Sequence, residues 1–339
     1  RSMTGGWNDV LMVFAPSTWR AILRGESTLN AGLATVALPA FADVVASADA
    51  TFAWELRTFA KAQAEALRKC WTGKWVHRGY LGIEDLTLGE DRIFLDTQGF
   101  GAIGKVWTKE QCAELFKNVQ ELCVDPEPAG ARCLWPAMEG RFLEPGMDTN
   151  GGTWSAVDAW TAYAWSLHDP KPAWDYFLRA SMAKHAEAYP TIWYGIWSGP
   201  DSFNAAYHKD AGRTFNINLT PMTDFPVMNM NRHAGTLNTA LRVGGLRPEG
   251  GRIRFTPHVP LEDFALKTPL IGGVWIAGKH RGYYTPLYKG TFKFAVAAPA
   301  NAFLLKINGE ERELTRDDEG HVCFEADGAP GKRIEWEIE

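Results

Sequence analysis

Three segments of the chain place carboxylates among aromatic residues and glycines. They are GGWNDV at residues 5–10, AMEGRFLEPGMDTNGGTW at 137–154 and TIWYGIWSGPDSF at 191–203. Acidic residues that only serve solubility usually stand on polar or helical surfaces beside lysine and arginine. These surroundings are instead typical of loops that line a site, and the carboxylates concerned are Asp9, Glu139, Glu144, Asp148 and Asp201.

Loops of this kind suit the cleavage of a glycosidic bond. The leaving oxygen of a sugar needs a proton, and a carboxylic acid whose pKa is raised by burial against an aromatic ring can supply it. Aromatic faces also suit the flat, apolar C–H surfaces of sugars. The chain holds 15 tryptophans, and 12% of its residues are aromatic. We therefore expect an oligosaccharide substrate.

Other motifs point away from cofactor chemistry. The segment GFGAIG at residues 99–104 fits the G-x-G-x-x-G pattern of dinucleotide sites, but no βαβ unit surrounds it. Close packing of helices explains these small residues better. The histidines show no metal-ligand spacing, and the five cysteines form no C-x-x-C pair. The sequence therefore indicates neither a metal nor an organic cofactor.

The composition is that of an ordinary globular protein of 339 residues. The net charge of -5 offers no basic field for nucleic acid or for anionic lipid, so neither is an expected partner. No uncharged apolar run has the length of a membrane span, and the N-terminal RSMTGG is not a signal peptide. We expect a cytoplasmic protein.

Apolar periodicity divides the chain into a helical part and a β part. Residues 27–70 predict two helices joined near residues 48–51, and Thr108 with Gln111 forms a capping-box pattern for a helix that runs to about Cys123. After these the pattern changes to short alternating segments separated by Gly, Pro and Asn turns. We expect an α-rich domain at residues 1–245 and an antiparallel β domain at 246–339. Further helices are expected at 153–167, 173–188 and 232–243.

Several motifs resemble those of glycoside hydrolase family 94, which contains cellobiose phosphorylases, chitobiose phosphorylases and a domain of cyclic β-1,2-glucan synthases. GGWNDVLM resembles its G-G-D-W-N-D-G-M signature, and NGGTW resembles its E-N-G-G motif. GKWVHRGY and RIFLDTQ resemble two further segments, D-G-E-W-x-x-R-x-Y and K-I-F-L-x-x-Q-x-W. The resemblance covers residues 5 to about 260 and keeps the order of the motifs.

The resemblance implies a fold that is mainly α with a β domain: part of an (α/α)6 barrel of helical hairpins, followed by a small antiparallel β-sandwich or lid. In the family the W-N-D motif lies in the middle of the barrel, so this chain resembles the C-terminal part of a larger protein. The missing N-terminal half of the barrel, in the same or a separate chain, is then an expected partner. A half barrel exposes apolar helix faces, so a homodimer is a second expectation.

The resemblance also assigns roles to residues. It makes Asp9 the general acid and places Trp7 beside it at a sugar subsite. In the family, inorganic phosphate attacks the anomeric carbon from the opposite face with inversion, and no protein base is needed. Phosphate is therefore an expected co-substrate, with a sugar 1-phosphate as the product. The other residues expected to bind substrate are Asn8, Gln98, Asn150, Trp154, Trp193, Trp197 and Arg232.

Two departures from the family pattern leave the attacking group open. Ala156 stands where the family has a phosphate-binding histidine, and Ala234 stands where it has a threonine. If water attacks instead, a second carboxylate must act as base, about 6.5–9.5 Å from the acid. Asp148, Glu139, Glu144 and Asp201 are the candidates, whereas Arg213, Arg232 and His233 could form a shifted anion site. The alternatives are thus an inverting phosphorylase, an inverting hydrolase or a non-catalytic sugar-binding subunit.

Overall fold

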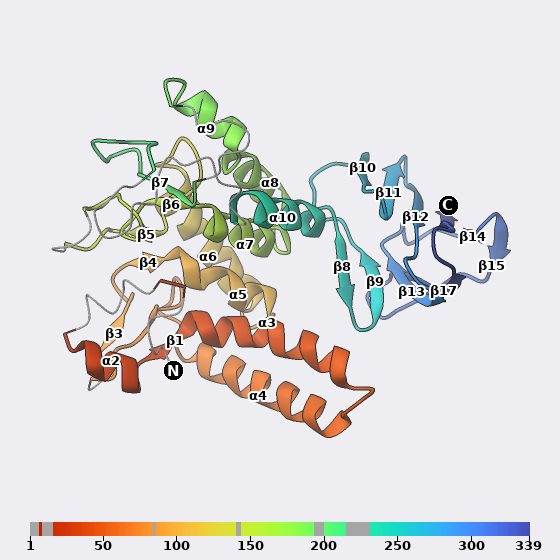
Figure 1. The fold of residues 1–339 in the computed structure, drawn as a ribbon, viewed down its shortest axis with the longest axis horizontal. Coiled ribbons are helices and arrows are strands. Elements are labelled where there is room, and N and C mark those ends of the chain that lie inside the picture. Colours follow the sequence, from red (N-terminus) through yellow and green to blue (C-terminus); the bar gives the residue numbers. More distant parts are fainter. Residues whose placement is uncertain (1–6, 9–15, 84–85, 140–143, 193–199, 215–230) are drawn as a thin grey trace. The chain divides into compact units, whose positions relative to one another are not determined.

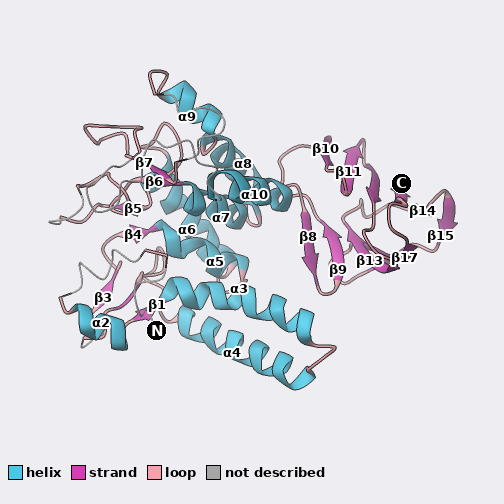
Figure 2. Cartoon of the chain, viewed as in Figure 1, coloured by secondary structure: helices cyan, strands magenta, loops and turns pink. Residues whose placement is uncertain are grey.

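The computed structural model describes residues 7–8, 16–83, 86–139, 144–192, 200–214 and 231–339. Its internal contacts divide the chain into two compact units, Arg1–Thr239 and Ala240–Glu339. The first unit is built mainly of helices and the second of strands, as Figure 2 shows. This agrees with the expected combination of a mainly α part and a β part. The described helices do not establish an (α/α)6 barrel, which stays a prediction.

A helical hairpin occupies the residues where one was expected. Helices α3 (Thr28–Val45) and α4 (Ala50–Arg68) run side by side in Figure 1 and are joined by residues 46–49. Each helix begins at a side-chain cap, because Ser27 accepts a hydrogen bond from the Asn30 N–H and Asp49 accepts one from the Phe52 N–H. The caps explain why the two helices start where they do.

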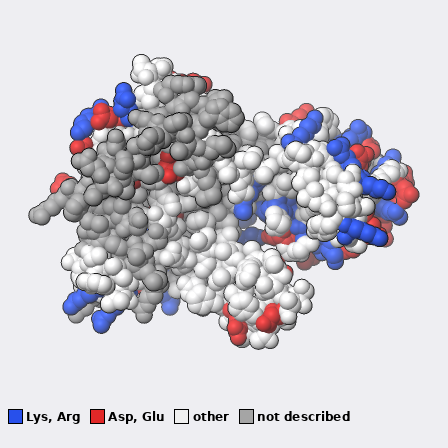
Figure 3. All heavy atoms as spheres, viewed as in Figure 1, with Lys and Arg blue, Asp and Glu red and all other residues white. Residues whose placement is uncertain are grey.

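One face of α3 is apolar and exposed. Leu33, Phe41 and Val44 are 42%, 49% and 74% exposed, and their successive spacings of eight and three residues place them on one side of a helix that also packs against α4. By length and composition alone α3 could cross a membrane, a criterion that the packed helix of a globular unit also meets. In Figure 3 the visible surface of the hairpin is mostly uncharged, with acidic side chains near its loop end, whereas charges of both signs cover the β-rich unit.

The capping box predicted at Thr108 and Gln111 is confirmed at the start of α6 (Lys109–Val119). Helix α6 ends earlier than expected and continues as a π-helical turn, η2 (Gln120–Val124). The single helix expected at 173–188 is wrong, because the chain forms α8 (Pro170–Arg179) and then α9 (Met182–Ala188). The hydroxyl of Ser181 accepts the Lys184 N–H and so caps a new helix.

The core of the helical unit forms where α6 and α8 meet α7 (Ser155–Ser166). The rings of Phe116 and Trp165 stack at a centroid distance of 5.2 Å, and Tyr176 packs against Trp165. Helix α5 (Gln98–Ile103) contains the glycines of GFGAIG. A Cβ at Gly101 would lie 2.4 Å from the Trp107 ring nitrogen, so this glycine permits close packing.

Short elements connect these helices and complete the unit. Strand β4 pairs with β5, β6 pairs with β7, and β1, β2 and β3 form a three-stranded sheet in that order. The remaining described elements of this unit are α2 (Thr18–Arg24), β1 (Glu26–Ser27), β2 (Gly79–Tyr80), β3 (Thr87–Leu88), β4 (Ile93–Phe94), η1 (Leu95–Thr97), β5 (Leu134–Trp135), β6 (Thr153–Trp154), β7 (Ser202–Phe203) and η3 (Asn231–Gly235). Helix α10 (Thr236–Val243) follows η3 and runs into the second unit.

Two sheets make up the β-rich unit. One has the order β10-β11-β12-β18-β14-β15 and is antiparallel throughout, and the other has the order β16-β17-β13-β9-β8. Their strands are β8 (Leu246–Glu249), β9 (Arg252–Phe255), β10 (Phe264–Lys267), β11 (Ile271–Ile276), β12 (Lys279–Tyr284), β13 (Gly290–Val296), β14 (Leu305–Ile307), β15 (Glu310–Arg312), β16 (Thr315–Arg316), β17 (Val322–Gly328) and β18 (Ile334–Ile338).

The β-rich unit is antiparallel as expected, except at one pair of neighbouring strands. Strand β9 runs parallel to β13, with Phe294 opposite Ile253. Parallel neighbours need a long connection, and here three strands of the other sheet lie between them in the chain. Inside the unit, Phe294 stacks on Phe324 at 4.9 Å and contacts Trp336, so the two sheets share one apolar core.

Candidate active site

The W-N-D motif and the N-G-G-T-W segment meet in the structure. The ring of Trp7 packs edge-on against those of Trp154 and Trp160, with centroid separations of 5.0 and 5.9 Å. Asn8, which follows Trp7, is buried. Asp9 itself lies outside the described residues. The contact brings together two residues predicted to bind sugar, Trp7 and Trp154, although they are far apart in the sequence.

The N-G-G turn holds a neighbouring loop in place. The amide group of Asn150 accepts the Met138 N–H and donates to the Met138 carbonyl, both at 2.8 Å. Asp148 is buried in the left-handed region at φ 49°, and its carbonyl accepts the Gly152 N–H. Because both polar atoms of the Asn150 side chain bond to main chain, this residue orients the segment that leads to Glu139.

Asp201 lies next to Trp154. Strands β6 and β7 pair Trp154 with Ser202, and both the N–H and the hydroxyl of Ser155 donate to the Asp201 carbonyl. The half-buried carboxylate of Asp201 accepts a hydrogen bond from the side-chain amide of Asn231 at 3.0 Å. Among the candidate bases that the structure describes, Asp201 is the one that these bonds connect to the tryptophan cluster.

The two glutamates expected as candidate bases are exposed. Glu144 binds His208 and Lys209, each at 3.0 Å, and these hydrogen bonds hold the pKa of its carboxyl below the usual value. A lowered pKa makes a carboxylate a weaker base. Glu139 is also exposed and follows the segment that Asn150 holds. Neither residue is brought to Trp7 by the described contacts.

Gln98 is fully buried and engaged by the main chain. Its amide donates to the carbonyls of Val76 and Phe94, and its side-chain oxygen accepts the Val76 N–H. A residue used in this way joins two parts of the chain. In the described structure Gln98 therefore has a positioning role, whereas the sequence had suggested that it binds substrate.

Arg232 is a buried cation close to Asp201. Its guanidinium donates to the carbonyls of Pro200 and Ala180 at 3.4 and 3.1 Å and lies over the ring of Phe203. Burial lowers the pKa of Arg232 to about 10, and the negative charges of Asp158 and Asp201 oppose this effect. These contacts tie Arg232 to the turn that carries Asp201. The other predicted binding residues, Trp193 and Trp197, lie outside the described residues.

A buried carboxyl group behind this site was not singled out from the sequence. Burial raises the pKa of Asp158 in α7 to about 7, while a hydrogen bond from the Tyr176 hydroxyl at 2.5 Å and the charge of Arg232 act in the opposite direction. The available signal was a single carboxylate in the otherwise apolar run SAVDAWTAYAW.

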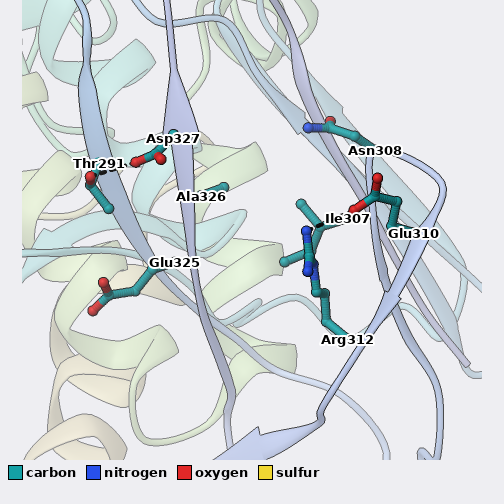
Figure 4. A pocket seen from close by; sticks show the side chains of 8 residues that line it. All are labelled: Thr291, Ile307, Asn308, Glu310, Arg312, Glu325, Ala326 and Asp327. Atoms are coloured by element: carbon teal, nitrogen blue, oxygen red, sulfur yellow. Dashed lines mark hydrogen bonds and ion pairs between the residues drawn. The ribbon is translucent and has the colours of Figure 1, made fainter.

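The β-rich unit has a pocket of its own, of about 440 Å³, shown in Figure 4. Its polar side chains largely satisfy one another, since Glu310 pairs with Arg312 and Thr291 donates to Asp327. Within the described part of the chain, no group of three or more His, Cys, Asp or Glu residues could hold a metal ion. The tryptophan cluster around Trp154 therefore remains the better candidate site.

Comparison with known proteins identifies the class of molecule. Residues 1–216 match the model of the glycosyl hydrolase 94 superfamily, catalytic domain. This match supports a carbohydrate-active enzyme, and it covers Trp7, the N-G-G turn and Asp201. The chain belongs to the glycosyl hydrolase 94 superfamily.

More distant similarities concern solved structures. The chain is similar to a GH127 β-L-arabinofuranosidase from Geobacillus stearothermophilus T6, with 11% identity and a TM-score of 0.26 over 73% of this chain and 41% of that one. It is also similar to an α-L-rhamnosidase from Dictyoglumus thermophilum, with 9% identity and a TM-score of 0.36 over 89% and 31%. The chain thus spans less than half the length of these structures. No curated protein is significantly similar to it.

Proposed function

We propose that the protein cleaves β-glycosidic bonds of glucosides or similar oligosaccharides with inversion at the anomeric carbon, and that Asp9 is the general acid. Membership of the superfamily supports this proposal, together with the contact of Trp7 with Trp154. In the sequence, Asp9 directly follows Asn8, which is buried. The aromatic cluster supplies the faces on which a sugar ring can lie.

In its first form the proposed reaction is a phosphorolysis. Inorganic phosphate attacks the anomeric carbon, the glycosidic bond breaks, and Asp9 protonates the leaving oxygen. The products are a sugar 1-phosphate and the shortened sugar. Phosphate brings its own negative charge, so the enzyme needs a single carboxylic acid and no base. The family resemblance of the W-N-D and N-G-G motifs supports this form.

The second form is a hydrolysis, and the surroundings of α7 favour it. Ala156 is buried in the first turn of α7, where the family resemblance leads us to expect a phosphate-binding histidine. Arg232 is fully buried and bonded to main-chain carbonyls. Asp201, by contrast, offers a half-buried carboxylate beside Trp154. In this form Asp201 takes a proton from the attacking water.

Incubation with β-linked disaccharides, with and without phosphate, separates the two forms. Appearance of a sugar 1-phosphate only when phosphate is present supports phosphorolysis, and release of free sugar without phosphate supports hydrolysis. Asp175, an exposed carboxylate on α8, provides the control variant Asp175→Asn, which should leave either activity intact. If the protein binds the disaccharide but forms neither product, it is a sugar-binding subunit and the proposal fails.

A further inference from the structure

The turn that carries Asp201 is held by three separate contacts. Ser155 donates twice to the main-chain carbonyl of Asp201, and Arg232 donates to the carbonyl of Pro200 before it. The third contact is different in kind, because the side-chain amide of Asn231 donates to a carboxylate oxygen, Oδ1 of Asp201, at 3.0 Å. The first two contacts fix the main chain, and only the third fixes the carboxylate.

We propose that Asn231 is a positioning residue that holds the carboxylate of Asp201 for general-base catalysis. The inference deepens the proposed function and rests on its hydrolytic form. A water oxygen bonds to the anomeric carbon as the glycosidic bond breaks. The carboxylate of Asp201 takes the proton that this water loses, and Asp9 gives its proton to the leaving oxygen. With Oδ1 bound to Asn231, the other oxygen, Oδ2, is the one that receives the proton.

The hydrogen bonding of the Asp201 carboxylate agrees with these separate roles for its two oxygens. In the part of the chain that the structure describes, Oδ1 accepts the Asn231 amide and Oδ2 has no hydrogen-bond partner. A carboxylate that rotates freely would lose this distinction between its oxygens. A bound amide N–H also stabilises the ionised carboxylate, since hydrogen bonds to the charged form favour that form. Asn231 therefore keeps the carboxylate of Asp201 oriented.

A neighbouring cation, Arg232, attracts the carboxylate of Asp201. Arg232, on η3 next to Asn231, is a buried cation whose electrostatic attraction extends to both Asp201 and Asp158. Asp158 faces Arg232 from α7 and accepts the Tyr176 hydroxyl. Because burial raises the pKa of Asp158, part of its population is protonated near pH 7 and does not compete fully for the cation. The attraction of Arg232 therefore remains available to the carboxylate of Asp201.

A purely structural role for Asn231 is the alternative, in which the bond only ties η3 to the start of β7. The two explanations differ in what a reversed pair would do. The double variant Asp201→Asn with Asn231→Asp keeps a hydrogen bond between the same two positions but moves the carboxylate. If the bond is only structural and Asp201 is not the base, activity should survive the exchange. If Asp201 is the base, the exchanged protein should keep its melting temperature and lose its activity.

The test uses the full chain and a β-linked disaccharide without phosphate, with free sugar as the readout. Asn231→Ala should lower kcat about tenfold or more and leave KM within about twofold, because the loss of a hydrogen bond to a charged group costs about 1.5–3 kcal/mol. It should also move the acidic limb of the pH–rate profile to higher pH. Asn118→Ala, which removes a side-chain amide that bonds to Glu114 within α6, is the control.

The outcomes separate this inference from the proposed function. An unchanged pH–rate limb in Asn231→Ala, or an active exchanged pair, overturns the role of Asn231 while wild-type hydrolysis stands. Wild-type protein that releases sugar only with phosphate overturns the hydrolytic form and this inference together. Should Asn231→Ala lower the melting temperature, Asn231→Ser, which retains a donor, is expected to recover part of kcat if the inference holds and none if it does not.

Discussion

Replacement of Asp158 by asparagine should change how the stability of the protein depends on pH. Burial raises the pKa of this carboxyl from 3.8 to about 7, so between these values the folded state holds a proton that the unfolded state has released. Stability therefore falls as pH rises through this window and is constant above about pH 7. The difference of about three pH units corresponds to about 4 kcal/mol as an upper limit, at 1.36 kcal/mol per unit.

Asparagine removes this titration but keeps an oxygen that can accept the Tyr176 hydroxyl. It loses one acceptor, which the Ala131 N–H uses in the wild type, and we expect a cost of about 1 kcal/mol that does not vary with pH. The variant should therefore be less stable than the wild type near pH 4.5, and by pH 8 its free energy of unfolding should have risen relative to that of the wild type by about 2–3 kcal/mol.

Urea unfolding followed by tryptophan fluorescence at several pH values measures this difference. Because every other titrating group is shared, the free energy of unfolding of the variant minus that of the wild type isolates Asp158. Asp175→Asn on the surface of α8 is the matched control and should show no such trend. A difference between Asp158→Asn and the wild type that stays constant from pH 4.5 to 8 would refute the reasoning, since it would mean that Asp158 is ionised throughout.

Three further predictions concern other parts of the chain. Burial lowers the pKa of the fully buried His280 to about 3, so the unfolded state binds a proton below about pH 6.5 that the folded state does not, and stability falls as the pH drops from about 6.5 toward 3. His280→Phe, which can still stack on Trp275, lacks this titration and should unfold at lower pH than the wild type. Equal acid midpoints would contradict this. Gly101→Ala should cost about 1–3 kcal/mol in urea unfolding because its Cβ would overlap the Trp107 ring, and an unchanged midpoint would show that the ring can move. We also propose that a second copy of this chain covers the exposed apolar face of α3, so Val44→Lys should reduce self-association in sedimentation velocity. A wild-type protein that stays monomeric at high concentration would exclude the homodimer.

Local rules in the sequence predicted much of the helical unit. The capping box at Thr108 and Gln111 and the apolar spacing of residues 27–70 depend on neighbours within a few residues, and both gave helices at the right places. The break between α8 and α9 follows a local rule as well, because Ser181 is a good cap, but the apolar spacing continues across it and masks the signal.

Contacts between segments that are distant in the sequence could not be predicted from these local rules. The parallel contact of β9 with β13 depends on strands that lie more than 30 residues apart, and nothing in the alternation of either strand indicates the direction of its neighbour. The burial of Gln98 is similar, since its partner Val76 lies in another segment. For the candidate site, motif resemblance supplied the link between the W-N-D and N-G-G segments, and the contact of Trp7 with Trp154 agrees with it.

The most direct test of the account is the response of Asp9→Asn to the leaving group. A general acid matters when the leaving oxygen is poor, and an activated leaving group departs without a proton. We predict that Asp9→Asn loses about 100-fold or more in kcat on an unactivated β-linked disaccharide while retaining most of its activity on a β-glycosyl fluoride. Full activity of the variant on the disaccharide, or an equal loss on both substrates, would contradict the role of Asp9 as the proton donor.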